Sequence, residues 1–335
     1  MKKTIALLCA VLMLLSLAAC GNNNSSNEPV ATDNGGAAAS GSETYTIGIC
    51  QLVQHEALDA ATQGFKDAIV EALGEENVRF DEQNAAGDSA TCTTIVNGFV
   101  SEGVDLIMAN ATPALQAAAA ATNDIPILGT SVTDYGVALE IDDFDGVVGG
   151  NVSGTSDSVP FEEQAAMVLE IFPDTKNVGI VYCSGEPNSV VQADIVQAAL
   201  EDAGVTVKVY TFADSNDVAA VTATACSENE VLYIPTDNTA ANCAEAINNV
   251  ALPAGVPIIA GEEGICKGCG IATLSISYYS IGRATGEMAV KILTGEADIS
   301  TMEVITDPNP VKKYNVDIAE ALNVTIPDGY EPIEE

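Results

Sequence analysis

Residues 104–129, VDLIMANATPALQAAAAATNDIPILG, decide the fold class of this chain. Residues 104–109 are apolar except for Asp105, which predicts a short strand buried on both faces of a sheet. Pro113 then opens a run of alanines, as proline is tolerated in the first turn of a helix. A second apolar run follows at residues 125–129. A strand, a helix and a strand in this order predict a βαβ unit of a parallel sheet.

The same alternation extends in both directions along the chain. Upstream, strands are predicted at residues 45–50 and 78–80 and helices at 56–73 and 88–101, the second capped by Asp88. Downstream, helices are predicted at 161–172, 188–203, 218–226 and 239–250, and strands at 178–183, 205–212, 231–235 and 256–260. The pattern changes near residues 140–160. The sequence therefore predicts an α/β protein with two doubly wound parallel-sheet lobes.

The N-terminal residues have the pattern of an export signal. Basic Lys2 and Lys3 precede an apolar run over residues 5–17, and residues 17–20, LAAC, resemble a bacterial lipobox. We expect residues 1–19 to be a signal peptide and residues 20–43 to be a flexible tether acylated at Cys20. The alternative is an ordinary secreted protein with a chance cysteine. With the anchor, the protein is expected on the outer face of the cell membrane.

The composition argues against several functions. A formal net charge of −37 disfavours nucleic acid, because phosphate contacts need clustered Lys and Arg. After Cys9 and Cys20, seven cysteines remain, and an odd number cannot all pair within one chain. Cys266 and Cys269 form a CxxC without a second pair, and His55 is the only histidine. We expect no metal or cofactor, and buried thiols or one local disulfide.

Ligands of open parallel sheets bind beyond the carboxyl ends of the strands. The corresponding loops here are residues 51–56, 84–88, 110–113, 130–135, 184–189, 213–217, 236–239 and 261–264. They hold acidic and hydroxyl side chains but no Lys or Arg. A polyanion would be repelled there, whereas a zwitterion could place its carboxylate at helix N-termini and its ammonium at an acid.

These loops also carry a family resemblance. Residues 51–59, 111–118, 131–134, 185–189, 235–239 and 278–283 resemble, in order, segments of the ABC transporter substrate-binding lipoproteins of the tryptophan and tyrosine type. The resemblance runs from Tyr45 to Pro327. It departs at Tyr135, where the family often has Pro, and at Ser277, where it often has Asp.

The resemblance implies a type I periplasmic-binding-protein fold with a three-segment hinge. Lobe 1 would then comprise residues 44–153 plus about 277–306, and lobe 2 residues 154–276 plus about 307–335. Hinges are expected near residues 151–155, 275–277 and 306–310, with the lobes closing on the ligand.

Eleven residues of the strand-end loops are candidates for ligand binding: His55, Glu56, Thr112, Ser131, Thr133, Asp134, Asn188, Ser189, Asp237, Asn238 and Glu262. A structural role is the alternative for seven of them, namely a helix cap for Thr112, Asp237 and Asn238, a helix start for His55 and Glu56, and a turn for Thr133 and Asp134. We expect Asp237 to hold the ammonium group, with Asp134 or Glu262 in reserve. Asp237→Ala would then weaken binding about 10- to 200-fold without affecting the fold.

Aromatic and basic side chains complete the set of candidates. Tyr135, Tyr278 or Tyr279 could supply an aromatic wall or serve as packing residues, and Arg283 is interpreted as a structural ion-pair partner.

The function indicated is that of an exported, monomeric solute-binding lipoprotein which delivers an uncharged, most plausibly aromatic, amino acid to the permease and ATPase of an ABC importer. No nucleophile elbow, P-loop or Ser-His-Asp pattern indicates an enzyme. Two alternatives stay open: a receptor subunit for a sensory kinase or chemoreceptor, and a binding protein for a neutral sugar or nucleoside.

Overall fold

The computed structural model describes residues 44–307 and 309–333. The predicted signal peptide, the tether and the lipidation site at Cys20 lie outside these residues. Among the described residues, no helix is both long and apolar enough to span a bilayer.

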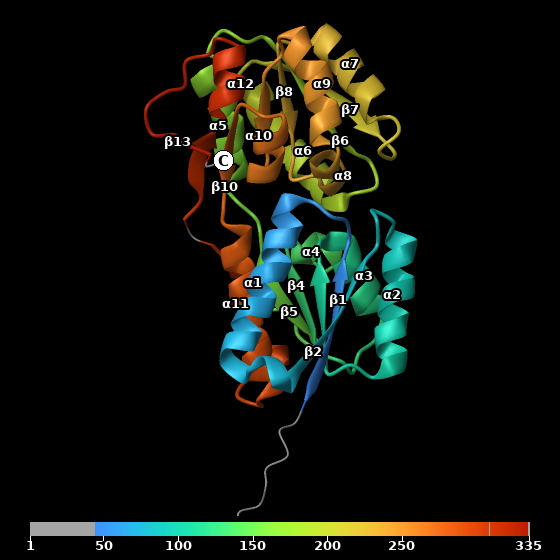
Figure 1. Cartoon of the computed structure of the whole chain (residues 1–335). Coiled ribbons are helices and arrows are strands. Elements are labelled where there is room, and N and C mark those ends of the chain that lie inside the picture. The colour runs from blue at the N-terminus through green and yellow to red at the C-terminus, as the bar shows by residue number, and fades with distance from the viewer. Residues whose placement is uncertain (1–43, 308, 334–335) are drawn as a thin grey trace, which may run out of the picture. The chain divides into compact units, whose positions relative to one another are not determined.

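Two sheets organise the described residues, and each forms the centre of one lobe (Figure 1). The sheet of lobe 1 has the strand order β11-β5-β4-β3-β1-β2 and is parallel throughout. Its strands are β1 (Tyr45–Gln51), β2 (Val78–Asn84), β3 (Leu106–Asn110), β4 (Ile127–Thr130), β5 (Val152–Ser156) and β11 (Ile305–Thr306). Its helices are α1 (Glu56–Leu73), α2 (Ser89–Glu102), α3 (Thr112–Ala121), α4 (Tyr135–Ala138) and α11 (Tyr278–Leu293).

The sheet of lobe 2 has the order β13-β12-β10-β9-β8-β6-β7. Its strands are β6 (Asn177–Cys183), β7 (Thr206–Phe212), β8 (Val231–Ile234), β9 (Ile258–Ala260), β10 (Ala272–Ser275), β12 (Val311–Tyr314) and β13 (Glu331–Pro332). Its helices are α5 (Phe161–Ile171), α6 (Pro187–Asp202), α7 (Val218–Glu228), α8 (Asn238–Asn242), α9 (Ala244–Ala254), α10 (Glu263–Gly268) and α12 (Val316–Ala321). β12 runs antiparallel to β10, so this sheet is mainly rather than wholly parallel.

The apolar run that predicted β3 supplies both faces of its sheet. Leu106 and Met108 pack with α1 and α11 in one core cluster, whereas Ile107 and Ala109 pack with α2 and α3 in another. Successive side chains of a strand point to opposite faces, so a strand covered on both faces needs apolar residues at every position. The two doubly wound lobes expected from the sequence are confirmed by this arrangement.

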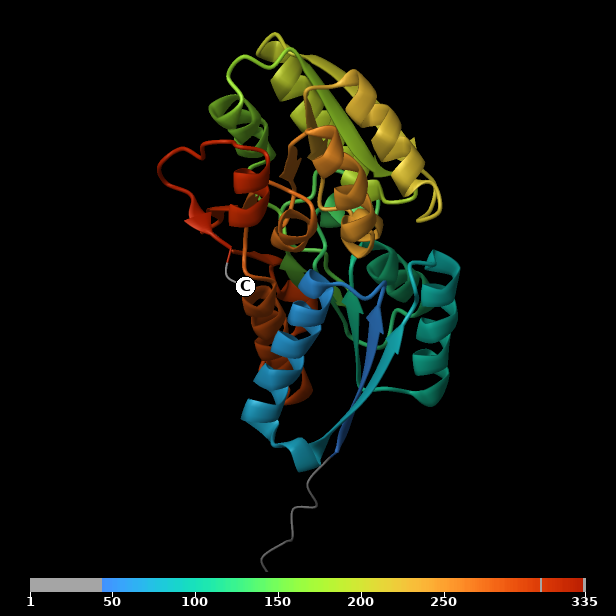
Figure 2. The ribbon, with the colours of Figure 1, turned by 45° about the horizontal axis from the view of Figure 1, so that its top comes forward.

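Helices α1 and α11 lie side by side in both views of the ribbon, although more than 200 residues separate them in the chain (Figures 1 and 2). Glycines allow the close approach of their backbones. A Cβ atom added at Gly282 of α11 would lie 2.0 Å from the carbonyl oxygen of Ala61, and one at Gly64 would lie 2.2 Å from that of Tyr279. This packing fixes α11 to lobe 1.

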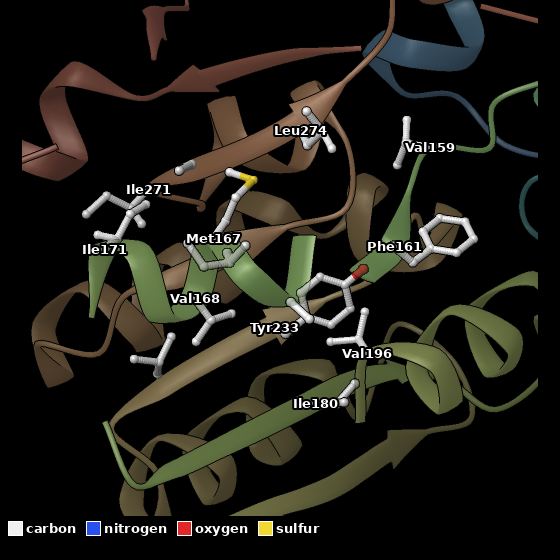
Figure 3. Close-up of a cluster of buried hydrophobic side chains, with 14 of the residues drawn as sticks. Val159, Phe161, Met167, Val168, Ile171, Ile180, Val196, Tyr233, Ile271 and Leu274 are labelled. Carbon is white, nitrogen blue, oxygen red and sulfur yellow. The ribbon is translucent and has the colours of Figure 1, made fainter. Parts of the chain in front are cut away.

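In lobe 2, one face of the sheet is covered by α5 and α6 (Figure 3). Met167 and Val168 of α5 and Val196 of α6 lie over Ile180 and Tyr233 of the strands. The buried hydroxyl of Tyr233 donates a hydrogen bond of 2.6 Å to Oε1 of Gln164. That bond satisfies the one polar group that the tyrosine brings into this core.

The chain passes between the sheets three times, after β5, after β10 and after β11. β5 extends to Ser156 and is hydrogen-bonded to β4 and β11, so the chain leaves the first sheet only at Asp157. The first hinge predicted at residues 151–155 is therefore misplaced, because those residues are held within a sheet. The predicted lobe boundaries as a whole stay a prediction.

The predicted elements differ from the observed ones at several places, and α4, α12, β10, β11 and β13 were not predicted. The helix predicted at residues 239–250 is two helices, α8 and α9, joined at Cys243. β5 was not predicted because its sequence, VSGTS, contains one bulky apolar residue. α10 and β12 were not predicted either, because lysines interrupt their short apolar patterns. α10 has six residues including Lys267, and β12 has four residues, two of which are lysines.

Candidate functional site

A cavity of about 370 Å³ lies between loops at the carboxyl ends of strands in both lobes. Lobe 1 contributes Leu52, Val53, Ala86, Gly87, Asp88, Ser89 and Pro113, and lobe 2 contributes Cys183, Gly185, Glu186, Ala213, Asp214, Ser215, Thr239 and Asn242. Its lining combines apolar side chains with three carboxylates and contains no Lys or Arg. A volume of this size lies within the range of small-molecule sites, roughly 300–1,000 Å³.

Three helices begin at this cavity. Asp88 caps α2 by accepting a 2.8 Å hydrogen bond from the backbone N–H of Ala90, Pro113 occupies the first turn of α3, and Glu186 precedes α6. Helix N-termini present backbone N–H groups and partial positive charge. The cavity thus offers both anionic side chains and anion-binding helix ends, as a zwitterion requires.

Two backbone positions in lobe 1 are strained at the cleft side of the sheet. Ala111 and Ser131, which follow β3 and β4, have φ values of 87° and 54°, in a region that favours glycine. The hydroxyl of Ser131 is also buried without a hydrogen-bond partner. Strain and unpaired polar groups of this kind concentrate at binding sites, where a ligand can compensate them. Thr112, another predicted ligand residue, is buried in the first turn of α3.

Asp237 lies in lobe 2, where protein donors surround its carboxylate. Oδ2 accepts hydrogen bonds from the backbone N–H of Cys183 (2.7 Å) and from the hydroxyl of Ser189 (2.8 Å), and Oδ1 accepts one from the N–H of Ala240 (2.8 Å). Burial and the nearby Glu186 carboxylate raise the pKa of Asp237, whereas its three hydrogen bonds lower it and favour the ionised form. The bond from Ala240 makes Asp237 the N-cap of α8, which is the alternative considered from the sequence, and the predicted contact with a ligand ammonium stays a prediction.

Glu186, which the sequence did not single out, holds the beginning of α8. Its Oε2 accepts from the backbone N–H (2.9 Å) and the side-chain Nδ2 (2.7 Å) of Asn238, and its Oε1 accepts from the N–H and hydroxyl of Thr239 (2.9 and 2.8 Å). Asn188 donates to the carbonyl of Thr236, and its own Oδ1 is buried without a partner. The structure thus pairs Ser189 with Asp237 and Asn238 with Glu186, and Asn188 lies beside them on Thr236.

The two acids held in reserve for the ammonium cap helices. Glu262 accepts from the N–H groups of Gly264 (2.6 Å) and Ile265 (2.5 Å) at the start of α10, and burial raises its pKa to about 7. Asp134 accepts from the N–H of Val137 at 2.9 Å at the start of α4. Both acids therefore cap helices; a turn was the alternative considered for Asp134, and the cap at Glu262 was not predicted.

A second polar network crosses between the lobes near the first passage of the chain. Asp157 is 5% exposed and accepts hydrogen bonds from the hydroxyls of Thr133 and Tyr278, each 2.9 Å long. Gln192 of lobe 2 lies 3.4 Å from the Thr133 hydroxyl and accepts from the N–H of Thr236. Burial raises the pKa of Asp157. Sequence reasoning missed Asp157 because it missed β5, the strand that Asp157 follows.

His55 and Glu56 contact lobe 2 directly. His55 Nε2 lies 3.2 Å from Oδ1 of Asn238, and Glu56 Oε1 lies 3.1 Å from Nζ of Lys267. Neither residue lines the 370 Å³ cavity. The structure gives both residues contacts between the lobes, and their predicted contact with a ligand stays a prediction.

The three candidate tyrosines have different environments. Tyr135 is 1% exposed, donates to the carbonyl of Thr155 and stacks on Phe144, so the packing alternative describes it. Tyr279 donates to Asp67 on α1. Tyr278 reaches Asp157. Arg283 forms the structural ion pair that was expected, 2.7 Å from Glu71.

All seven cysteines of the described residues are free thiols. Cys266 and Cys269 are both buried, and burial raises the pKa of each thiol, which disfavours the reactive thiolate. Within residues 44–307 and 309–333, His, Cys, Asp and Glu side chains form no group of three or more that could hold a metal ion.

Comparison with known proteins identifies the family. The model of the ABC transporter substrate binding protein family matches residues 46–330. The chain belongs to this family. A curated relative, the tyrosine-binding protein of Clostridioides difficile (strain R20291), is 34% identical over 287 residues, which are 83% of each chain. Members of this family bind small molecules and work with transporter components, so a binding protein rather than an enzyme is supported.

Two solved structures of ABC transporter substrate-binding proteins are informative. An ABC domain in complex with L-Trp from Streptococcus pneumonia has a TM-score of 0.82 at 30% identity and covers 87% of this chain and 100% of its own. A substrate binding protein with adhesive properties from Clostridium difficile, in a ligand-free, open structure, has a TM-score of 0.65 at 37% identity. It covers 87% of this chain and 99% of its own. Both share the type I periplasmic-binding fold with this chain.

Proposed function

We propose that this protein is the extracytoplasmic solute-binding lipoprotein of an ABC importer and that it captures an amino acid with an uncharged, aromatic side chain. The observation that carries the proposal is the 370 Å³ cavity enclosed by strand-end loops of both lobes. A ligand bound there contacts both lobes at once. It therefore favours the closed arrangement over the open one, which is the event an importer must recognise.

The chemistry of the cavity supports a zwitterion. Leu52, Val53 and Pro113 offer apolar surface for an aromatic ring, while Asp88 and Asp214 are exposed carboxylates that attract an ammonium group. The N-termini of α2, α3 and α6 suit a carboxylate. Phosphorylated or polycarboxylic ligands are disfavoured, because no Lys or Arg lines the cavity.

The comparisons support the same ligand class. The curated relative is named for tyrosine, and the Streptococcus structure contains L-Trp. This chain resembles the L-Trp complex more closely than the ligand-free, open structure, even though its sequence identity is higher to the latter. We infer that the arrangement of the lobes described here is the closed, ligand-binding one.

A thermal-shift screen tests the ligand class. The twenty amino acids, a panel of neutral sugars and a panel of nucleosides are each added to the purified protein. We expect L-tryptophan, L-tyrosine or L-phenylalanine to raise the melting temperature, because a ligand at 100 times its Kd stabilises the bound state by about 2.7 kcal/mol. Stabilisation by a sugar or nucleoside, with every amino acid inactive, would contradict the proposed ligand.

The lipid anchor is tested at Cys20. In the full-length protein, Cys20→Ala is expected to move the protein from the membrane fraction to the soluble fraction, because the thiol to be acylated is absent. Cys50→Ala is the matched control, since that thiol is buried in lobe 1, and it should leave the distribution unchanged. A Cys20→Ala protein that still sediments with membranes after salt and carbonate washing would refute the anchor.

A further inference from the structure

Two contacts at the beginning of α1 join the lobes outside the ligand cavity. One is the hydrogen bond between Nε2 of His55 and Oδ1 of Asn238, and the other is the ion pair between Glu56 and Lys267. None of the four residues lines the 370 Å³ cavity, although Asn238 is hydrogen-bonded to Glu186, which does. Three of them, His55, Glu56 and Lys267, line a second cavity of about 290 Å³, which shares Asn242 with the first.

We propose that His55, Glu56, Asn238 and Lys267 form an interlobe latch that stabilises the closed arrangement without touching the ligand. The latch residues are positioning residues: they change ligand affinity by changing how often the lobes are closed. This inference rests on the proposed function only for its ligand. The effect on closure itself is independent of ligand identity.

The hydrogen-bond network fixes the direction of the His55 contact. Nδ2 of Asn238 donates to Glu186 at 2.7 Å, so Oδ1 of the same amide faces His55 as an acceptor. Nε2 of His55 therefore carries the proton and donates. Nδ1 is left unprotonated and is buried without a partner. Glu186 thereby orients the Asn238 amide, whose oxygen accepts the hydrogen bond from His55.

The ion pair between Glu56 and Lys267 differs from the other ion pairs in joining the two lobes. Seven ion pairs occur within the described residues, and of these only Glu56–Lys267 joins one lobe to the other. Its side chains are 60% and 40% exposed, so its contribution is small and sensitive to salt. In a chain with a formal net charge of −37, one lysine facing the other lobe also lowers the repulsion between them.

Protonation of His55 opposes the latch. The charged groups that face His55 are Glu186 from lobe 2 and Asp59 and Glu56 from α1, with Lys267 paired to Glu56. Burial outweighs the carboxylates and lowers the pKa of His55 in the closed state. Opening exposes the ring and returns it towards its ordinary value of about 6.5. The contribution of neutral His55 to the stability of the closed state is therefore fully present above that pH and is lost as the pH falls below it.

The experiment compares four proteins in two measurements. Wild type, His55→Ala, Lys267→Ala and the control Lys66→Ala are studied by small-angle scattering without ligand and by calorimetric titration with L-tryptophan and L-tyrosine. Lys66 pairs with Glu82 at 2.8 Å within lobe 1, so its removal deletes a similar charge pair without affecting the latch.

We expect His55→Ala to increase the radius of gyration of the ligand-free protein. The affinities for L-tryptophan and L-tyrosine should both fall by the same factor, about 3- to 10-fold. Lys267→Ala should weaken both by about 2- to 4-fold at low salt, with the difference vanishing at high salt. Lys66→Ala should match wild type. A change in the ratio of the two affinities in His55→Ala would instead show a ligand contact and overturn the latch, as would an unchanged radius of gyration.

The pH profile separates the latch from a merely structural role of His55. Wild-type affinity is expected to fall by about 3- to 10-fold between pH 7.5 and 5.5. His55→Gln keeps an N–H donor for Asn238 without a titrating group, so its affinity should be near wild type at pH 7.5 and flat with pH. Asp157 and Glu262, whose pKa values are raised, are unchanged in both proteins, so the difference between the two pH profiles reports His55. A pH dependence as large in His55→Gln as in wild type contradicts the latch. If neither amino acid binds wild type, the ligand proposal fails while scattering still tests the latch.

Discussion

Replacing Asp237 by asparagine is expected to lower the free energy of unfolding by about 3 kcal/mol, because a buried amide cannot replace both oxygens of the carboxylate. The backbone N–H of Cys183 donates to one oxygen and that of Ala240 to the other. An amide has one oxygen, so whichever way it turns, its NH₂ group faces a second N–H. At 1% exposure no bulk water reaches the site to compensate.

The matched control is Asp298→Asn. Asp298 also caps a helical turn, and its Oδ1 accepts from both the N–H and the hydroxyl of Ser300, but the side chain is exposed. Its replacement should cost at most about 1 kcal/mol, since one amide oxygen serves both donors. Urea unfolding followed by circular dichroism measures both variants. Equal stability of the two would show that the network around Asp237 is not required.

This expected loss of stability differs from the interpretation made from the sequence, in which Asp237 was not needed for the fold. From its place in a strand-end loop, Asp237 was expected to bind an ammonium group and to be dispensable for the fold. The structure makes it the acceptor for three donors in lobe 2. Any loss of ligand affinity in Asp237→Ala must therefore be compared with the loss of stability that the same change produces.

Replacing Gly282 by valine is expected to cost at least about 4 kcal/mol, and this is the larger of the two effects. A Cβ at this position would lie 2.0 Å from the carbonyl oxygen of Ala61 and 2.7 Å from its carbonyl carbon. These are backbone atoms of α1, so no side-chain rotation relieves the overlap. The two helices must move apart, which opens the core cluster containing Phe65 and Met288.

Gly98→Val is the control for the helical glycine. Gly98 lies within α2, and a Cβ added there would meet no atom within 4 Å. This substitution should be neutral or slightly stabilising, because removing a glycine from a helix reduces the entropy of the unfolded chain. Thermal unfolding compares the two variants. A Gly282→Val protein as stable as Gly98→Val would contradict the close packing of α1 on α11.

The packing of α1 on α11 also bears on the proposed closure. The chain returns to lobe 1 through α11, and the latch begins at the first turn of α1. The packed pair of helices therefore holds the residues that contact lobe 2 in a fixed position relative to lobe 1. We expect Gly282→Val to weaken ligand binding as well as stability, even though Gly282 lies outside the cavity.

The sequence by itself determined the elements that repeat a clear pattern. Largely apolar runs such as residues 104–109 and helices with capping residues such as Asp88 are local signals, and the structure has β3 and α2 there. Their alternation decides a parallel α/β sheet because a parallel connection needs a crossover. The same reasoning located the strand-end loops, several of which line the 370 Å³ cavity.

The tertiary structure alone decided what each polar residue of those loops does. Asp237, Glu262 and His55 lie in similar loops and are equally suited to a ligand by residue type, yet one satisfies buried donors, one caps a helix and one contacts the other lobe. Asp157 follows β5, whose weak apolar pattern is stabilised by β4 and β11 on either side. Hydrogen-bond partners of buried polar groups come from residues distant in the chain, so their roles depend on long-range packing that no local pattern encodes.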